Sequence, residues 1–220
     1  LGRADRKVGF FASYALLVKD VIGLYRNPST RTTFWFLVAS AVFRDGLGAV
    51  FTFGAVIAST VFHFRFLDLV IFGVAANLIA GVSTILAGRL DDRWGPKRLI
   101  LISLASMCVA GIAVFALVDT GPIAYWVGGL ILCAFVGPAQ SAGRSFLARV
   151  TPAGREGEVF GLYATTGRAA SWIAQGAWTL LIILTGNTRF GILGIVAVLL
   201  AGLLLLLPVK EARSSVRLSH

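Results

Sequence analysis

The sequence predicts an all-α membrane protein in which six transmembrane helices form a three-plus-three inverted repeat. Two observations predict this fold class. Apolar and aromatic residues make up 57% of the 220 residues and charged residues only 14%, whereas a soluble domain carries about 25% charged residues. The apolar residues also gather into six segments long enough for a helix to cross a bilayer, which takes about 20 residues. A membrane barrel would instead show alternating segments of about 10 residues, which the sequence lacks.

The expected helices divide the chain into three regions. Residues 1–33 are expected to form a cytoplasmic basic segment, 34–209 the six-helix transmembrane domain, and 210–220 a cytoplasmic tail. In the first region, Lys19 and Asp20 interrupt the apolar stretch 8–25, so we expect an interfacial helix, with a flexible linker as the alternative. The six expected spans are Phe34–Ile57, Leu69–Gly88, Leu99–Val118, Pro122–Gly143, Val159–Thr185 and Phe190–Val209.

The basic residues predict the orientation in the membrane. The chain has 20 Lys and Arg against 10 Asp and Glu, and 16 of these basic residues lie on the side of the two termini. Only Arg65 and Arg189 lie on the other side. Cytoplasmic loops collect Lys and Arg, so we expect a bacterial inner (plasma) membrane protein with both termini in the cytoplasm. Topology accounts for the net charge of +10, so the lipid bilayer is the expected partner and nucleic acid is not.

Polar residues are distributed unequally among the spans. Spans one, two, four and five carry polar or charged residues, whereas spans three and six carry no charge. A repeat of three helices, two of which line a cavity while the third is peripheral, would give this order. The expected substrate pathway therefore draws on the polar spans, and its candidate residues are Asp45, Arg168, Arg44, Gln140, Gln175 and Asn77.

Three of these candidates are ionisable groups in mid-span. Arg44 lies in span one about 15 Å deep at helical rise, and Arg168 lies at a similar depth in span five. Each intramembrane charge costs about 2.5–3.5 kcal/mol on insertion scales, so we expect both to face a cavity or a partner. Asp45 is the natural partner, although adjacent helical residues such as Arg44 and Asp45 do not pair directly unless the helix is distorted. The alternative role is a buried ion pair that only locks helices together.

Helical spacing also aligns residues along span five. Thr165, Arg168, Trp172 and Gln175 follow one another at intervals of three and four residues, which places them in one stripe on a continuous helix. Arg168 and Asp45 are therefore expected to face one shared cavity.

The loop after span two is a candidate gate at the cytoplasmic end. Gly88 would let the helix end pack closely, Gly95 would supply an unusual backbone angle, and Asp92 could pair with a helix N-terminus. In span four, Gly137 and Pro138 predict either a bend with a gating role or a kink needed only for packing. The candidate gating residues are Gly88, Asp92, Arg93, Gly95, Lys97 and Arg144.

The ordered string from Gly88 to Lys97 resembles the signature loop of the major facilitator superfamily of secondary transporters, which often has a basic residue in place of Pro96. Further strings extend the likeness at consistent spacing, and they are Phe43–Gly46, Val136–Ser141, Arg155–Tyr163 and Thr166–Arg168. They resemble the carboxyl-terminal half of the bacterial "unknown major facilitator" family, which is related to fungal autophagy-linked vacuolar effluxers. That family usually has Asn where this chain has Arg44, and Lys where it has Arg168.

The resemblance implies a twelve-span carrier that works by alternating access, with an amino-terminal six-span half as the partner of this chain. It implies a small polar solute such as an amino acid or an organic anion, exported in the fungal relatives, and leaves proton coupling open. Two other classes remain as alternatives, namely a non-catalytic membrane scaffold and a lipid-modifying membrane enzyme.

Residues for catalysis or metal binding do not stand out. Both His63 and His220 lie outside the spans, and Cys108 and Cys133 fall inside apolar runs without metal-ligand spacing. No phosphate-binding loop of an ATP-driven pump is found in the sequence. We therefore expect no enzyme activity, no cofactor and no metal site.

Overall fold

The computed structural model describes residues 31–152 and 154–209, so the expected interfacial helix and cytoplasmic tail lie outside the described residues. The described part is helical, as expected, and five of its helical segments are long and apolar enough to cross a membrane. Its helices are α2 (Arg31–Thr60), α3 (Phe66–Trp94), α4 (Pro96–Ala116), α5 (Pro122–Val150), α6 (Glu156–Ala169), α7 (Ile173–Thr185) and α8 (Gly191–Leu206), with short 3-10 turns η1 (Val118–Thr120) and η2 (Thr188–Phe190).

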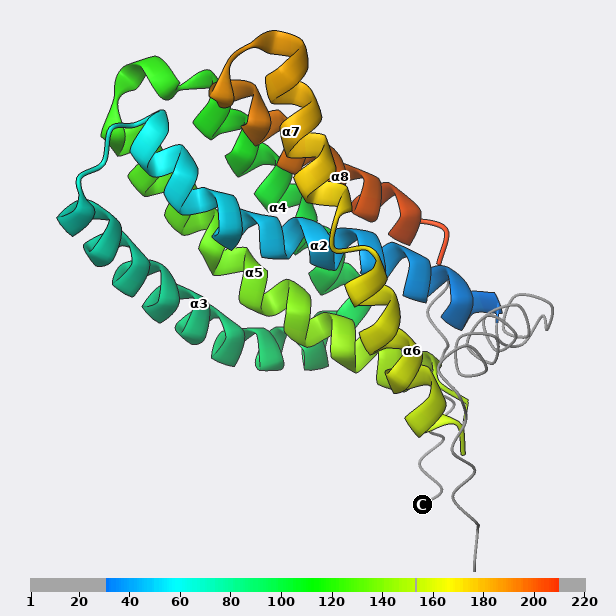
Figure 1. Ribbon diagram of the computed structural model, residues 1–220. Helices are drawn as coiled ribbons and strands as arrows, with labels where there is room; N and C mark the ends of the chain where they lie inside the picture. The colour runs from blue at the N-terminus through cyan, green and yellow to red at the C-terminus, as the bar shows by residue number, and fades with distance from the viewer. Residues whose placement is uncertain (1–30, 153, 210–220) are drawn as a thin grey trace, which may run out of the picture.

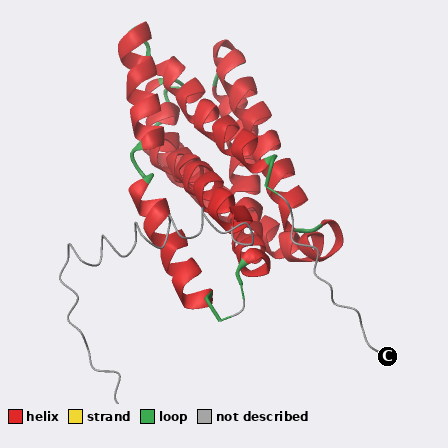
Figure 2. Ribbon diagram, turned by 90° about the vertical axis from the view of Figure 1, so that its right-hand side faces the viewer, coloured by secondary structure: helices red, strands yellow, loops and turns green. Residues whose placement is uncertain are grey.

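The long helices run back and forth between two ends of the molecule (Figures 1 and 2). One end carries the link from α3 to α4 and the link from α5 to α6, and the other carries the links from α2 to α3 and from α4 to α5. Arg93, Lys97 and Arg155 lie at the first of these ends, whereas Arg65 and Arg189 lie at the second. The helices thus place these five basic residues at two opposite ends, three at one and two at the other.

The fifth expected span corrects the sequence-based prediction. We expected one helix over Val159–Thr185, but the helix ends at Ala169 and a new one begins at Ile173. Between the two helices, backbone hydrogen bonds reach back three residues instead of the four of an α-helix. The Ser171 amide donates to the Arg168 carbonyl at 3.3 Å, and the Ile173 amide donates to the Ala170 carbonyl at 3.0 Å. Figure 1 shows the resulting interruption between α6 and α7.

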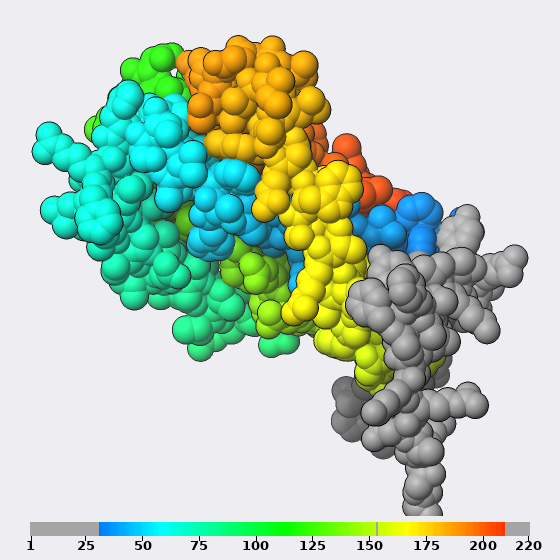
Figure 3. Space-filling view, viewed as in Figure 1, coloured from blue at the N-terminus to red at the C-terminus, as the bar shows by residue number. Residues whose placement is uncertain are grey.

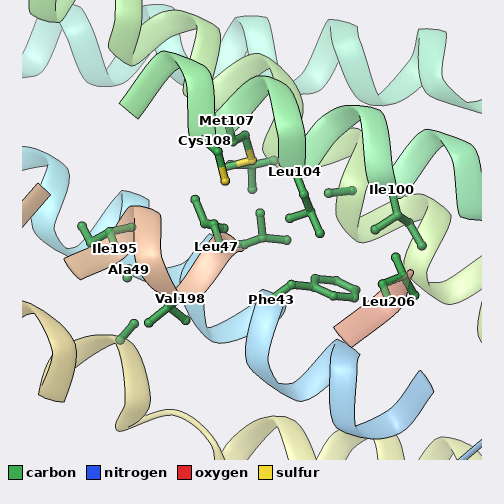
Figure 4. Packing of buried hydrophobic residues seen from close by; sticks show 14 of the residues in the cluster. Phe43, Leu47, Ala49, Ile100, Leu104, Met107, Cys108, Ile195, Val198 and Leu206 are labelled. Atoms are coloured by element: carbon green, nitrogen blue, oxygen red, sulfur yellow. The ribbon is translucent and has the colours of Figure 1, made fainter. Parts of the chain in front are cut away.

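The core lies where α2, α4 and α8 meet (Figure 4). Phe43 and Leu47 from α2, Leu104 and Met107 from α4, and Leu199 from α8 are fully buried there. The uncharged spans three and six are therefore α4 and α8, and they supply the apolar scaffold on which α2 is fixed. The polar residues Arg44 and Asp45 lie toward α6 and α7 instead, where they make hydrogen bonds to Tyr163 and Ala174.

The α3 helix packs mainly on α5 and leaves most of its apolar surface uncovered. Val74, Leu78, Val82 and Ile85 are all exposed. The contact with α5 is close, since a Cβ atom at Gly137 would lie 2.8 Å from the Ala80 carbonyl oxygen. Helix α5 also continues through the buried Pro138. Gly137 thus has a packing role at the α3–α5 crossing.

Candidate functional site

A polar pocket of about 310 Å³ lies between α2, α5 and the break that separates α6 from α7. Its lining residues are Arg44, Asp45, Gly48, Ala49, Thr52, Phe53, Gln140, Gly167, Ser171 and Gln175. Helices α2, α6 and α7 lie side by side on the face shown in Figure 3. The pocket brings together four of the six residues predicted for the substrate pathway, from three spans that are far apart in the sequence.

Asp45 binds the beginning of α7. Its Oδ2 atom accepts a hydrogen bond of 2.6 Å from the backbone amide of Ala174, the second residue of that helix. The first amides of a helix have no partner within the helix, and a negative charge near them is favoured by the helix dipole. Asp45 therefore caps the start of α7 from the middle of α2, a helix long and apolar enough to cross a membrane.

Arg44 binds α6, the other half of the interrupted span. Its Nη1 atom donates to the Tyr163 carbonyl oxygen at 2.8 Å, and its guanidinium carbon lies 4.0 Å from the centre of the Tyr163 ring. This arrangement combines a charge-assisted hydrogen bond with a cation–π contact. The cation is thus stabilised without a carboxylate partner among the described residues.

The two neighbouring residues of α2 therefore hold opposite sides of the break. Arg44 contacts α6 and Asp45 contacts α7, so they do not pair with each other. Helix α2 is continuous through both positions, and adjacent side chains on a helix point about 100° apart. The geometry makes this pair of residues a clamp across the interrupted helix.

Gly167 is needed for the approach of Arg44 to α6. A Cβ atom at this position would lie 2.8 Å from Arg44 Nη1 and 3.0 Å from its Cζ. No carbon side chain fits there unless the guanidinium moves away from the Tyr163 carbonyl.

We expect Gly167→Ala to have a free energy of unfolding about 1–3 kcal/mol below that of Gly161→Ala, because both changes gain helix propensity but only the first displaces the Arg44 guanidinium from the Tyr163 carbonyl. Gly161→Ala is the matched control, because Gly161 lies in the same helix with no atom within 4 Å of an added Cβ. The control should be neutral or stabilising by up to about 1 kcal/mol through helix propensity. Thermal unfolding in detergent, followed by circular dichroism, measures both variants, and equal melting temperatures would contradict this role of Gly167.

Arg168 and Asn77 are not brought into the polar pocket. Arg168 is exposed in the last turn of α6, where its charge is favourable to the helix dipole, and no ion pair of the described residues involves it. Asn77 is exposed, donates to the Gly73 carbonyl at 2.8 Å and lines a separate, mostly apolar pocket. The sequence predicted neither the break nor the pocket positions of Thr52 and Ser171, for which it carries no distinguishing signal.

The candidate gating loop shows one confirmed feature and one error. Gly95 has a φ of 82°, as expected for an unusual backbone angle. The close packing expected at Gly88 is wrong, because a Cβ atom there would meet nothing within 4 Å. The Lys97 Nζ atom donates to the Leu207 carbonyl at 2.9 Å, which ties the start of α4 to the end of α8.

A link between α3 and α5 also lies at this end. Asp91 Oδ1 lies 3.8 Å from Arg149 Nη2, whereas Asp92, Arg93 and Arg144 are exposed. The sequence predicted Asp92 for an interhelical contact and missed Asp91 and Arg149. Two adjacent aspartates on a helix point in different directions, and the sequence alone gives no way to choose between them.

Comparisons with known proteins identify relatives over almost all of this chain. The family model described as "Vacuole effluxer Atg22 like" matches residues 21–219. The chain is 23% identical to the uncharacterized MFS-type transporter YxiO of Bacillus subtilis, over 84% of the chain and 42% of that protein. It is 29% identical to Autophagy-related protein 22 of Cryptococcus neoformans, over 74% of the chain and 33% of that protein. The chain thus spans less than half the length of these relatives.

Proposed function

The chain belongs to the vacuole effluxer Atg22-like family, and we propose that it forms half of a secondary active transporter that moves a small polar solute by alternating access. Its long apolar helices and its MFS-type relatives make it a multi-pass membrane protein of the MFS type. The proposal extends this family relation to an activity, a solute class and a mechanism for this chain.

The observation that carries the proposal is the polar pocket at the interrupted helix. Ionisable residues within membrane spans are costly and mark solute and ion pathways. Arg44 and Asp45 are largely engaged by α6 and α7, which leaves the amides of Gln140 and Gln175 and the hydroxyl group of Ser171 at the pocket wall. The two amides both donate and accept hydrogen bonds, and the Ser171 hydroxyl, which donates to the Arg168 carbonyl at 2.8 Å, can still accept one. The pocket therefore suits a small polar solute such as an amino acid or an organic anion.

We propose that α6 and α7 together cross the membrane once, which gives six spans in a three-plus-three arrangement. The exposed apolar side chains of α3 and α7 support a larger assembly, because residues 31–152 and 154–209 leave Val74, Leu78, Ile183 and Leu184 uncovered. In this proposal, lipid and an amino-terminal six-span half cover them. Arg168, exposed beside the pocket-lining Gly167, then faces the solute pathway between the halves.

We propose that the end carrying most basic residues faces the cytoplasm and contains the gate. The contacts from Asp91 to Arg149 and from Lys97 to Leu207 join helix ends there. Opening toward the cytoplasm would separate α3 from α5 at this end, and exposed Asp92, Arg93 and Arg144 would contact the other half.

We expect solute flux only when both halves are present, because this chain supplies one wall of the pathway. The test is uptake of labelled amino acids and organic anions by liposomes that contain this chain, the amino-terminal half of the same transporter, or both, with empty liposomes as the control. Flux through the monomeric chain alone would contradict the half-transporter proposal. Absence of flux of every tested solute with both halves present would contradict the transporter proposal itself.

A further inference from the structure

Asp45 has a position that no other carboxylate shares in the described part of the chain. Within residues 31–152 and 154–209, every other Asp and Glu lies at a helix end or in the turn η1. These residues are Asp68, Asp91, Asp92, Asp119, Glu156 and Glu158. Asp45 lies in the middle of α2, half-buried, with its carboxylate on the first turn of α7. Its charge is balanced mainly by the amide end of a helix.

The cations on neighbouring elements do not neutralise Asp45 directly. Arg44 on the same helix is directed to Tyr163, and Arg168 in α6 and Arg144 in α5 are exposed. Helices α7 and α8 contain no ionisable residue, and no ion pair of the described residues includes Asp45. A proton is therefore the simplest ligand that can remove this intramembrane charge.

Resting on the proposed transporter, we propose that Asp45 is a proton-binding site whose protonation releases the first turn of α7 from α2. A proton from water binds a carboxylate oxygen and converts the charged acceptor into a neutral carboxylic acid. The hydrogen bond from the Ala174 amide then loses its charge assistance, which weakens it by roughly half. The favourable interaction of the carboxylate with the α7 dipole is lost at the same time.

Protonation acts on one half of the interrupted helix only. The contact between α2 and α6 is made by Arg44 and Tyr163 and does not involve Asp45, so it persists. Farther along α7, the Trp178 ring stacks on Phe53 of α2 with a centroid distance of 4.5 Å. The α7 helix is therefore held at Trp178 and released at Ala174, and residues 170–172 between the halves take up the change in angle. The movement alters the pocket wall, which Ser171 and Gln175 line on either side.

The experiment measures amide hydrogen exchange of the full chain in lipid nanodiscs, by mass spectrometry of peptides that cover residues 170–178. After correction for the intrinsic rate, we expect exchange at residues 173–176 to be about tenfold faster at about pH 5 than at about pH 8. Asp45→Asn should show the fast exchange at both pH values, because its amide side chain stays neutral. The pH series on the unaltered chain needs no variant, so it remains decisive if Asp45→Asn fails to fold.

Asp68→Asn is the matched control. Asp68 also accepts a hydrogen bond from a backbone amide at a helix start, that of Arg65 at 3.0 Å, but it lies at the end of α3. The control should keep the pH response of α7. Exchange in α7 that does not change with pH, or an Asp45→Asn variant that responds to pH as the unaltered chain does, would overturn the proposal. Exchange is measured without solute, so the two proposals can fail separately. Exchange that does not depend on pH would contradict the proton-binding proposal alone, and an absence of flux would contradict the transporter proposal alone.

Discussion

Replacing Asp45 with alanine is expected to lower the free energy of unfolding by about 1–3 kcal/mol, the cost of leaving a buried donor unpaired, and to abolish transport. The unpaired donor is the Ala174 amide, which donates to Asp45 Oδ2 at 2.6 Å. Asp45→Asn should keep most of the stability, because its amide oxygen can still accept this bond, yet it should also abolish transport. Thermal unfolding and pH-gradient-driven uptake in liposomes measure the two effects separately.

Asp68→Ala separates capping from transport. Asp68 caps the start of α3, so its loss should cost about 0.5–2 kcal/mol while flux with both halves is retained. If Asp68→Ala is less stable but still transports, lower stability does not by itself explain the loss of transport in the Asp45 variants. Uptake by Asp45→Asn at the rate of the unaltered protein would show that the ionised carboxylate at this position is not needed.

The helical fold could be predicted because hydropathy measures the property that a bilayer selects. The lengths of the apolar segments located the described helices, but several helices end later in the sequence than these segments do. Helix α3 continues past Gly88 to Trp94, and α5 continues past Gly143 to Val150. Hydropathy detects the part of a helix that suits lipid, whereas the helix itself ends where its backbone bonds end. Charged residues such as Arg93 and Arg149, at the end that carries the α3–α4 link, therefore belong to the helices and not to loops.

The break in the fifth span could not be predicted, because the contact that caps its second half comes from a distant part of the sequence. Residues 168–173 contain no proline or glycine, the residues that usually mark a kink. The cap on α7 comes from Asp45, which lies 129 positions before Ala174. A local pattern cannot reveal a helix start that depends on a carboxylate from another span.

The candidate site was predicted in part for the same reason. Arg44, Asp45, Gln140 and Gln175 could be proposed from polarity within apolar spans, and the pocket contains all four. The alignment of Arg168 with Gln175 assumed a continuous helix, with helical spacing kept across residues 170–172. The break changes that register, so Gln175 lines the pocket and Arg168 does not.

Arg168→Ala is expected to abolish transport while it changes the free energy of unfolding by no more than about 0.5 kcal/mol, as for surface substitutions in general. The side chain is exposed, and its removal breaks no ion pair among the described residues. In the proposed pathway between the two halves, its guanidinium binds a solute carboxylate through two hydrogen bonds. Arg168→Lys should retain part of the activity, because lysine keeps the charge but not the paired donors.

The double variant Arg168→Ala/Asp45→Ala separates this role from a helix-locking ion pair. Because the structure does not pair the two residues, their effects on stability should add within about 0.3–0.5 kcal/mol, and transport should stay absent. A locking pair would behave differently, since removing both partners would restore the stability lost on removing one. Recovered transport in the double variant, measured by the same uptake assay, would show that Arg168 and Asp45 act on each other and not on the solute.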